Sequence, residues 1–106
     1  MLITTTTSLD GHKIKEYRGV VFGEVISGIN FMRDFTASIH DTLGGRSDDY
    51  EAELVESRAA AIAEITKRAE KIGANAIIGL SIDYETIGQR GSMLMVVASG
   101  TAVVLE

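Results

Sequence analysis

Residues 73–79, Gly-Ala-Asn-Ala-Ile-Ile-Gly, join a long amphipathic stretch to an alternating one and constrain the fold more than any other segment. The stretch before them ends with Lys67, Arg68 and Lys71, and cations suit the negative end of a helix dipole. A glycine that follows such a turn commonly closes the helix in a left-handed conformation. The segment therefore predicts a helix that ends at Gly73 and a strand that begins directly after it.

The chain has 106 residues, enough for one domain with a modest core, and we expect residues 1–106 to form a single domain. Hydrophobic residues make up 45% and charged residues 24%, which is typical of a folded globular protein. There is no cysteine, which excludes disulfides and thiolate metal ligands and fits a reducing compartment. We therefore expect a cytoplasmic protein.

Charge and hydropathy argue against nucleic acid and membrane partners. The net charge is −5, and no cluster of Lys and Arg is present that could neutralise phosphates. The N-terminus lacks the basic and apolar regions of a signal peptide. The longest apolar run, residues 93–98, is far shorter than the roughly 20 residues that a spanning helix needs.

The first part of the chain predicts two strands and a helix. Residues 2–6 are mainly β-branched and precede the turn signal Asp10-Gly11, and residues 16–26 alternate in strand fashion. Gly19 and Gly23 within the second strand predict a bulge or a close approach by another backbone. Residues 30–43 carry apolar side chains at helical spacing, with Asn30 as N-cap, and Gly44-Gly45 is expected to end this helix.

A second, longer helix is predicted from Ser47 to Gly73. Its expected apolar stripe consists of Leu54, Arg58, Ile62, Ile65, Ala69 and Ile72. A third strand follows Gly73, with residues 74, 76, 78, 80, 82 and 84 on one face. Residues 88–91 form a turn before the last strand, residues 93–105.

The last strand is apolar on both faces, with Met93, Met95 and Val97 on one and Leu94 and Val96 on the other. An antiparallel sheet covered by helices on one side would leave its second face in water. Little chain remains to cover that face, so we expect another copy of the protein to do so. The predicted class is α+β, an antiparallel sheet packed against a long helix in the order β-β-α-α-β-β.

Several blocks of the sequence together resemble the YbjQ family of small bacterial proteins, over the whole chain. They include Thr4-Thr5-Thr6, Glu16-Tyr17, Gly44-Gly45-Arg46-Ser47, residues 73–79, Asp83-Tyr84-Glu85, residues 91–96 and residues 99–103. The resemblance implies a dodecin-like α+β subunit that assembles into a ring-shaped homopentamer. The family is uncharacterised and carries a label that proposes heavy-metal binding.

An anion site is one hypothesis for the function. Arg33, Arg46 and Arg58 could converge with Tyr50 and the Gly44-Gly45 backbone on a carboxylate or phosphate, because guanidinium forks suit both groups. The alternative is structural: Arg58 lies in the predicted apolar stripe and would need a carboxylate, from this chain or a neighbouring subunit. Asn75 could either stabilise the turn or line a ligand site.

Metal binding is a second hypothesis. The acids of residues 48–56, among them Glu53, could hold a hard cation, although acids also stabilise the start of a helix. His40, with Asp41 beside it, could form a symmetric site if a ring gathers one histidine from each subunit. No metal, cofactor or catalytic residue is specified by the spacing of these side chains.

The leading interpretation is thus a homo-oligomer, a pentamer, that acts as a binding or scaffold module. Its partners are other copies of the same chain, and the sequence does not specify its ligand. A protein that binds a heavy or divalent metal at a subunit interface is the alternative. An enzyme acting on a small anion is a further one, and it requires Arg33, Arg46 and Tyr50 to share one pocket.

Overall fold

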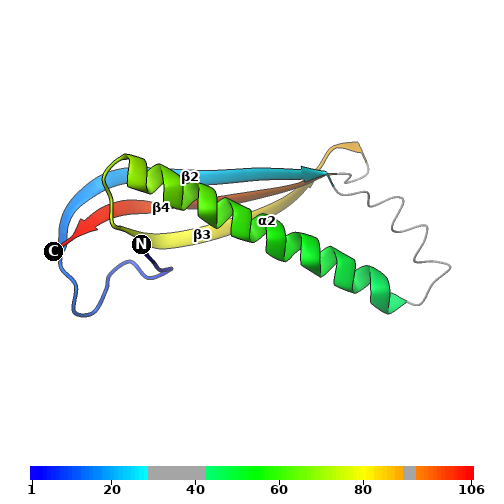
Figure 1. Ribbon diagram of the computed structural model, residues 1–106, viewed down its shortest axis with the longest axis horizontal. Helices are drawn as coiled ribbons and strands as arrows, with labels where there is room; N and C mark the ends of the chain where they lie inside the picture. Colours follow the sequence, from blue (N-terminus) through cyan, green and yellow to red (C-terminus); the bar gives the residue numbers. More distant parts are fainter. Residues whose placement is uncertain (29–42, 90–92) are drawn as a thin grey trace.

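The computed structural model describes residues 1–28, 43–89 and 93–106, and within residues 43–50 it describes the backbone only. Within these described residues, four strands and one long helix follow each other (Figure 1). They are β1 (Leu2–Ile3), β2 (Ile14–Gly28), α2 (Leu43–Lys71), β3 (Ala76–Ile87) and β4 (Met93–Leu105). The α+β class is confirmed. The helix expected over residues 30–43 lies almost entirely outside the described residues.

The sheet is mixed, whereas the sequence predicted an antiparallel one. Its strand order is β1-β3-β4-β2, and β4 is antiparallel to both of its neighbours. The short β1 runs parallel to β3, with Leu2 opposite Ala76 and Ile3 opposite Ile77. The parallel pair arises because the N-terminus enters beside β3 in the same direction, and the backbone N–H of Thr4 donates to Ile77 at 2.9 Å.

The long helix begins earlier than predicted. Helix α2 starts at Leu43 and runs through Gly44 and Gly45, so these glycines do not form an interhelical turn and Ser47 is not the N-cap. Its first turn contains no acid. Glycine costs about 1 kcal/mol in a helix interior, and at the very start of a helix few intrahelical hydrogen bonds depend on it.

The end of α2 is as predicted. Gly73 has a φ of 81°, and the backbone N–H groups of Gly73 and Ala74 donate to the carbonyls of Glu70 and Ala69, both at 3.0 Å. This pair of bonds is the Schellman pattern, which satisfies carbonyls at a helix end. Arg68 and Lys71 occupy the last turn, as the dipole favours.

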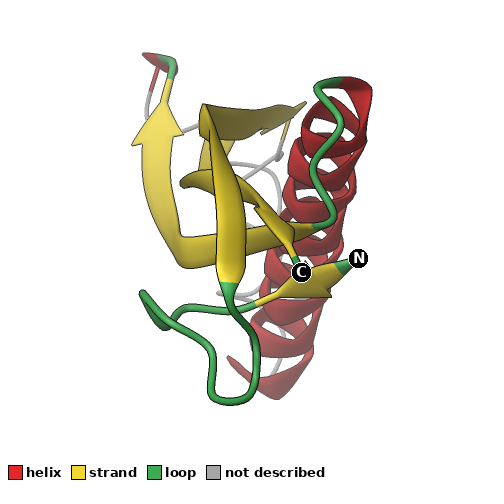
Figure 2. Cartoon of the chain, turned by 90° about the vertical axis from the view of Figure 1, so that its left-hand side faces the viewer, coloured by secondary structure: helices red, strands yellow, loops and turns green. Residues whose placement is uncertain are grey.

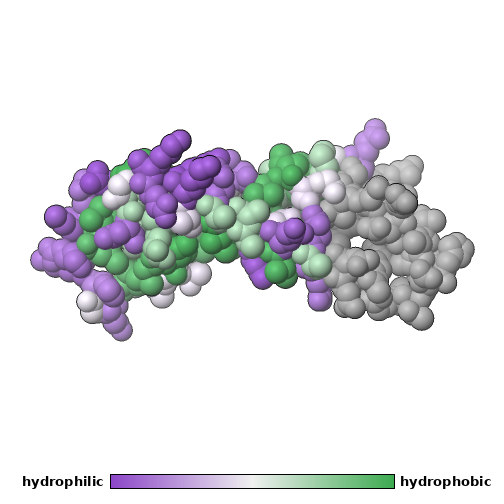
Figure 3. All heavy atoms as spheres, viewed as in Figure 1, coloured by the Kyte–Doolittle hydropathy of each residue, from purple (hydrophilic) through white to green (hydrophobic). Residues whose placement is uncertain are grey.

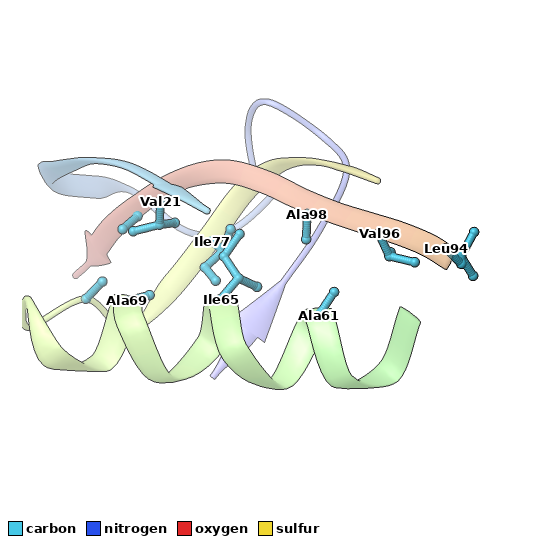
Figure 4. Close-up of a cluster of buried hydrophobic side chains, with 10 residues drawn as sticks. Val21, Ala61, Ile65, Ala69, Ile77, Leu94, Val96 and Ala98 are labelled. Carbon is cyan, nitrogen blue, oxygen red and sulfur yellow. The ribbon is translucent and has the colours of Figure 1, made fainter. Parts of the chain in front are cut away.

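The main core lies between α2 and one face of the sheet, which we call the inner face (Figures 2 and 4). The helix contributes Ala61, Ile65 and Ala69, all fully buried, and Ser57 at 4% exposure. The strands contribute residues that include Val21, Ile77, Leu94, Val96 and Ala98. Gly23 also faces α2, where a Cβ would lie 2.3 Å from the carbonyl oxygen of Ala61. The predicted close approach at Gly23 is confirmed.

The buried ridge of α2 differs from the predicted stripe. Its residues are four apart, and four residues turn about 40° beyond one full helical turn. The ridge therefore winds around the helix from Ser57 to Ala69. Arg58 lies about 100° from Ser57 on this helix, and it is exposed, as is Ile72. Placing Arg58 in a buried stripe was wrong.

Two bulges move side chains to faces that strict alternation did not predict. The register of β2 shifts between Tyr17 and Gly19, whose φ is 117°, which confirms the bulge expected at Gly19. Tyr17 consequently lies opposite Val103 rather than on the helix side. A second shift follows Ile78, beside Gly79 with its φ of 62°.

The N-terminal loop covers part of the second face of the sheet. Leu9 packs with Ile14 and Leu105 against a small buried cluster of Ala76, Ile78 and Val103. The loop is tied to β3 by hydrogen bonds from Gly79 N–H to the Thr6 carbonyl and from Leu80 N–H to that of Thr4. One end of this face is thereby covered within the chain.

Candidate functional site: the outer face of the sheet

The rest of the second face, which we call the outer sheet face, is not covered by any element of the described chain. Leu94, Val96 and Ala98 of β4 point into the core, so the residues between them, and the cross-strand partners of those residues, point outward. The outer sheet face comprises Tyr17, Val20, Phe22, Glu24 and Ile26 from β2, Met93, Met95, Val97, Ser99 and Thr101 from β4, and Ser81, Asp83, Glu85 and Ile87 from β3.

Large apolar side chains are exposed along β2. Tyr17 and Val20 are each 67% exposed, Ile26 is 60% exposed and Phe22 is 47% exposed. They lie on the same side of an edge strand, where Glu24 separates Phe22 from Ile26, and Met93 beside them on β4 is 37% exposed. Single exposed apolar residues are ordinary, but several large ones on one face mark an interaction surface.

Acids share this face with the apolar residues. Glu24 and Asp83 flank Val97 from opposite sides, and Glu85 pairs with Met95. From the cross-strand pair that contains Val20 to the pair that contains Met93, the three strands place three carboxylates and no Lys or Arg on the face. Apart from Glu24, the surface is thus apolar along β2, and it is negative along β3.

Arg68 lies at the outer edge of β2 and reaches that strand from α2. Its Nη1 donates to the carbonyl oxygen of Phe22 at 2.8 Å and lies 3.2 Å from Glu24, while its Nε lies 3.3 Å from Glu64. The guanidinium therefore partners Glu24 and a backbone acceptor of the edge strand. Asp83 and Glu85 belong to none of the ion pairs formed among the described side chains.

The side of α2 that points away from the core carries a second apolar surface, which we call the helix stripe. It consists of Ala52, Val55, Ala59, Ile62 and Thr66, spaced alternately by three and four residues. Val55 is 52% exposed, and Ala52 and Ala59 are exposed as well. The Thr66 hydroxyl donates to the Ile62 carbonyl at 2.7 Å, so this hydroxyl is directed toward the backbone of its own helix. Figure 3 shows apolar residues reaching the surface among polar ones on the helix side.

The structure settles the surroundings of two predicted site residues. Arg58 is exposed next to the helix stripe, three residues after Val55 and four before Ile62. Asn75 holds the end of β4: its Oδ1 accepts from the Leu105 N–H at 2.8 Å, and its Nδ2 donates to the Leu105 carbonyl at 3.3 Å. Both polar groups of the Asn75 amide are therefore engaged with backbone.

The other predicted site residues are not brought together by what the structure describes. Arg33, His40 and Asp41 lie outside the described residues, and only the backbone of Arg46 and Tyr50 is described. Their convergence on an anion stays a prediction. Glu53 of α2 accepts a hydrogen bond from the Ser27 hydroxyl at the end of β2, which ties the helix to the sheet.

Among the described side chains, those of residues 1–28, 51–89 and 93–106, no three His, Cys, Asp or Glu residues are grouped so as to hold a metal ion. No helix in this part of the chain is long and apolar enough to cross a membrane.

Sequence reasoning expected an apolar second face but missed its acids. The alternation after Ala74 placed Ile78 with Leu80, and the bulge at Gly79 reverses this relation in the structure. The available signal was Gly79 itself, since an isolated glycine in a strand pattern marks a bulge.

A family model described as "Putative heavy-metal-binding" matches residues 1–106, and it is that of the YbjQ family. The chain belongs to the YbjQ family. This YbjQ-family chain is 58% identical over 106 residues to a UPF0145 protein of Acetivibrio thermocellus, and 55% identical to one of Actinobacillus pleuropneumoniae. Both alignments cover 100% of each chain.

The fold of this YbjQ-family chain also occurs in a solved structure. A protein of unknown function from Pediococcus pentosaceus, assigned to the DUF74 family, superposes with a TM-score of 0.72 at 20% identity. The match covers 100% of this chain and 98% of that one. At this level of identity the likeness concerns the fold alone.

Proposed function

We propose that this protein is a self-assembling module of the cytoplasm, in which copies of the chain cover each other's outer sheet faces and form a ring of five. Its function is to bind a ligand or partner on the assembly, or to act as a scaffold. The observation that carries the proposal is the exposed row of Tyr17, Val20, Phe22 and Ile26 on one side of β2.

The energetics of that row favour association. Burying a Val, Ile or Phe side chain contributes about 1.5 to 3 kcal/mol relative to leaving it in water. Several such side chains on one face provide a driving force that can exceed the entropic cost of association. The acids on the same face need to remain hydrated or to meet cations.

The shape of the subunit supports the same proposal. The radius of gyration of the chain is 17.3 Å, whereas a compact domain of this length has about 13 Å. The extents of 57 × 25 × 16 Å describe an elongated, thin body. Such a body exposes a large surface area relative to the volume of its core, and packing against neighbouring copies reduces the exposed area.

A charge placed on the outer sheet face tests the proposal. We expect Phe22→Asp to abolish assembly, measured as molar mass by light scattering after size-exclusion chromatography, while circular dichroism shows a folded chain. Thr86→Asp is the matched control, because it adds the same charge to β3 opposite Leu94, on the other side of the sheet. If Phe22→Asp and the wild type have the same mass, the outer sheet face is not the interface.

Metal binding is the second candidate, and the description of the family favours it. The described residues of one chain do not fit a heavy-metal site, since there is no cysteine and Glu53 already accepts a hydrogen bond from Ser27. This candidate therefore requires His40 and Asp41 from several subunits. Metal analysis of protein purified without an affinity tag tests it: a stoichiometric metal lost in His40→Ala supports the site, and no metal with no thermal shift on adding Zn²⁺ removes it.

A further inference from the structure

Strand β2 forms one edge of the sheet, and its second half is a regular edge of the kind to which further strands can add. From Val20 to Gly28 it pairs with β4 without a register shift, and no described segment pairs with its other side. Residues 20–28 contain Val, Ile and Phe, no proline and one charged residue, Glu24. A free edge of this composition is a template for pairing with another chain.

The side chain of Arg68 crosses this edge. Helix α2 lies on the inner face, where Gly23 lies against it, whereas Glu24 belongs to the outer sheet face. The Arg68 side chain starts on α2, and its Nη1 lies 3.2 Å from the Glu24 carboxylate, so the guanidinium passes around the free side of β2. Glu64, one turn earlier on α2, lies 3.3 Å from the Arg68 Nε.

The same guanidinium occupies a backbone acceptor that an added strand would use. Its Nη1 donates to the Phe22 carbonyl at 2.8 Å, which is within the N···O range of a hydrogen bond between strands. The nitrogen therefore stands where an N–H of an incoming strand would stand. The rest of the guanidinium fills space that this strand needs, because neighbouring strands lie about 4.8 Å apart.

The direction of the Phe22 carbonyl shows which other groups of β2 are open. Residues of an antiparallel strand turn their N–H and C=O groups alternately toward one side and the other. Since Phe22 turns its groups outward, the even-numbered residues from 20 to 26 do so as well, and the odd-numbered residues between them bond to β4.

The first half of β2 is protected in a different way. Register shifts lie between Ile14 and Glu16 and between Tyr17 and Gly19, and the Arg18 guanidinium pairs with Glu16 at 3.3 Å. Bulges and charged side chains both hinder edge-to-edge pairing. Residues 20–28 have neither a register shift nor a Lys or Arg of their own, so the protection of this part comes from α2.

We infer that Arg68 blocks this edge: by occupying the Phe22 carbonyl, it prevents the β2 edge of a second copy from adding to the sheet. Two such edges would pair antiparallel about a twofold axis, so each unblocked copy would join one other. The inference does not depend on the proposed ring, because pairing through edges joins species of any size and leaves their outer sheet faces as they are.

Removing the side chain tests the inference. We expect Arg68→Ala to have at least twice the molar mass of the wild type at the same concentration, measured by light scattering after size-exclusion chromatography, and Lys67→Ala to keep the wild-type mass. In hydrogen exchange, the outward amides at positions 20, 22, 24 and 26 should gain protection in the larger species, while those between them stay as in the wild type. An equal mass for Arg68→Ala and the wild type, or the same increase in Lys67→Ala, would overturn the inference.

A second substitution separates edge pairing from aggregation of a destabilised chain. Ile26 is 60% exposed, and Ile26→Pro removes an outward N–H that β4 does not use, at a kind of position where edge strands tolerate proline. Arg68→Ala combined with Ile26→Pro should have the same mass as Ile26→Pro alone. Ile26→Ala is the matched control: it shortens the side chain but keeps the N–H, so adding Arg68→Ala to it should still at least double its mass. The inference is overturned if the larger mass persists with Ile26→Pro, disappears equally with Ile26→Ala, or forms without protection of the outward amides.

Discussion

Gly23 of β2 lies directly against the backbone of α2 at Ala61, where a Cβ atom would come within 2.3 Å of the carbonyl oxygen. The same Cβ would be 2.7 Å from the backbone nitrogen of Ile65. Both neighbours are main-chain atoms, so no side chain can rotate to make room. The absence of a side chain at Gly23 sets how closely the helix packs on the sheet.

Gly23→Ala should therefore destabilise the fold. Overpacking a well-packed contact costs about 1 to 3 kcal/mol, and we expect a lower midpoint in urea unfolding at a fixed protein concentration. Gly28→Ala on the same strand is the matched control, because no atom of the described residues lies within 4 Å of its added Cβ. Equal midpoints for the two variants would contradict the close approach.

Gly73→Val should also cost stability, for a different reason. The φ of Gly73 is 81°, which a β-branched residue adopts only with strain. We expect a loss of about 1 to 2 kcal/mol in the free energy of unfolding. Gly73→Asn is the control, since Asn tolerates the left-handed region, and it should lose less. A Val variant as stable as the wild type would argue against the helix cap.

Asn75→Ala should loosen the end of β4. The change removes both hydrogen bonds to Leu105 at an exposed site, where a hydrogen bond contributes about 1 kcal/mol. We expect faster amide exchange at Leu105 and a small loss of stability. Asn75→Asp keeps the acceptor for the Leu105 N–H but loses the donor, so it should protect that amide better than Ala does. Unchanged exchange in Asn75→Ala would remove this structural role.

Arg68→Ala should cost more than Lys67→Ala, although both are cations near the end of α2. Arg68 donates to the Phe22 carbonyl and pairs with Glu24 and Glu64, whereas Lys67 is in none of the ion pairs of the described residues. The Arg68 groups are partly exposed, so we expect a difference of about 1 kcal/mol. Thermal unfolding of the two variants measures it, and equal melting temperatures would contradict the role of Arg68.

Local signals predicted the elements well. Gly73 and the cations before it predicted the end of α2, the turn at residues 88–91 predicted the start of β4, and the two glycines of β2 predicted a bulge and a close approach. These features depend on the local backbone conformation and on neighbours in the chain. Both of these determine directly which residue types occur at a position.

Long-range effects explain what could not be predicted. The buried side of α2 depends on the angle at which the helix crosses the sheet, so Arg58 was misplaced by about a quarter turn. The parallel pairing of β1 depends on where the N-terminus lies beside β3. The acids of the outer sheet face share a side with Val97 and Met95 only because the bulge at Gly79 reverses the alternation.

Sedimentation velocity of the wild-type chain at micromolar concentration tests the central claim most directly. The exposed row on β2 predicts one assembled species whose mass is a multiple of the chain mass, five copies in the proposed ring. A single species with the mass of one folded chain would contradict the account.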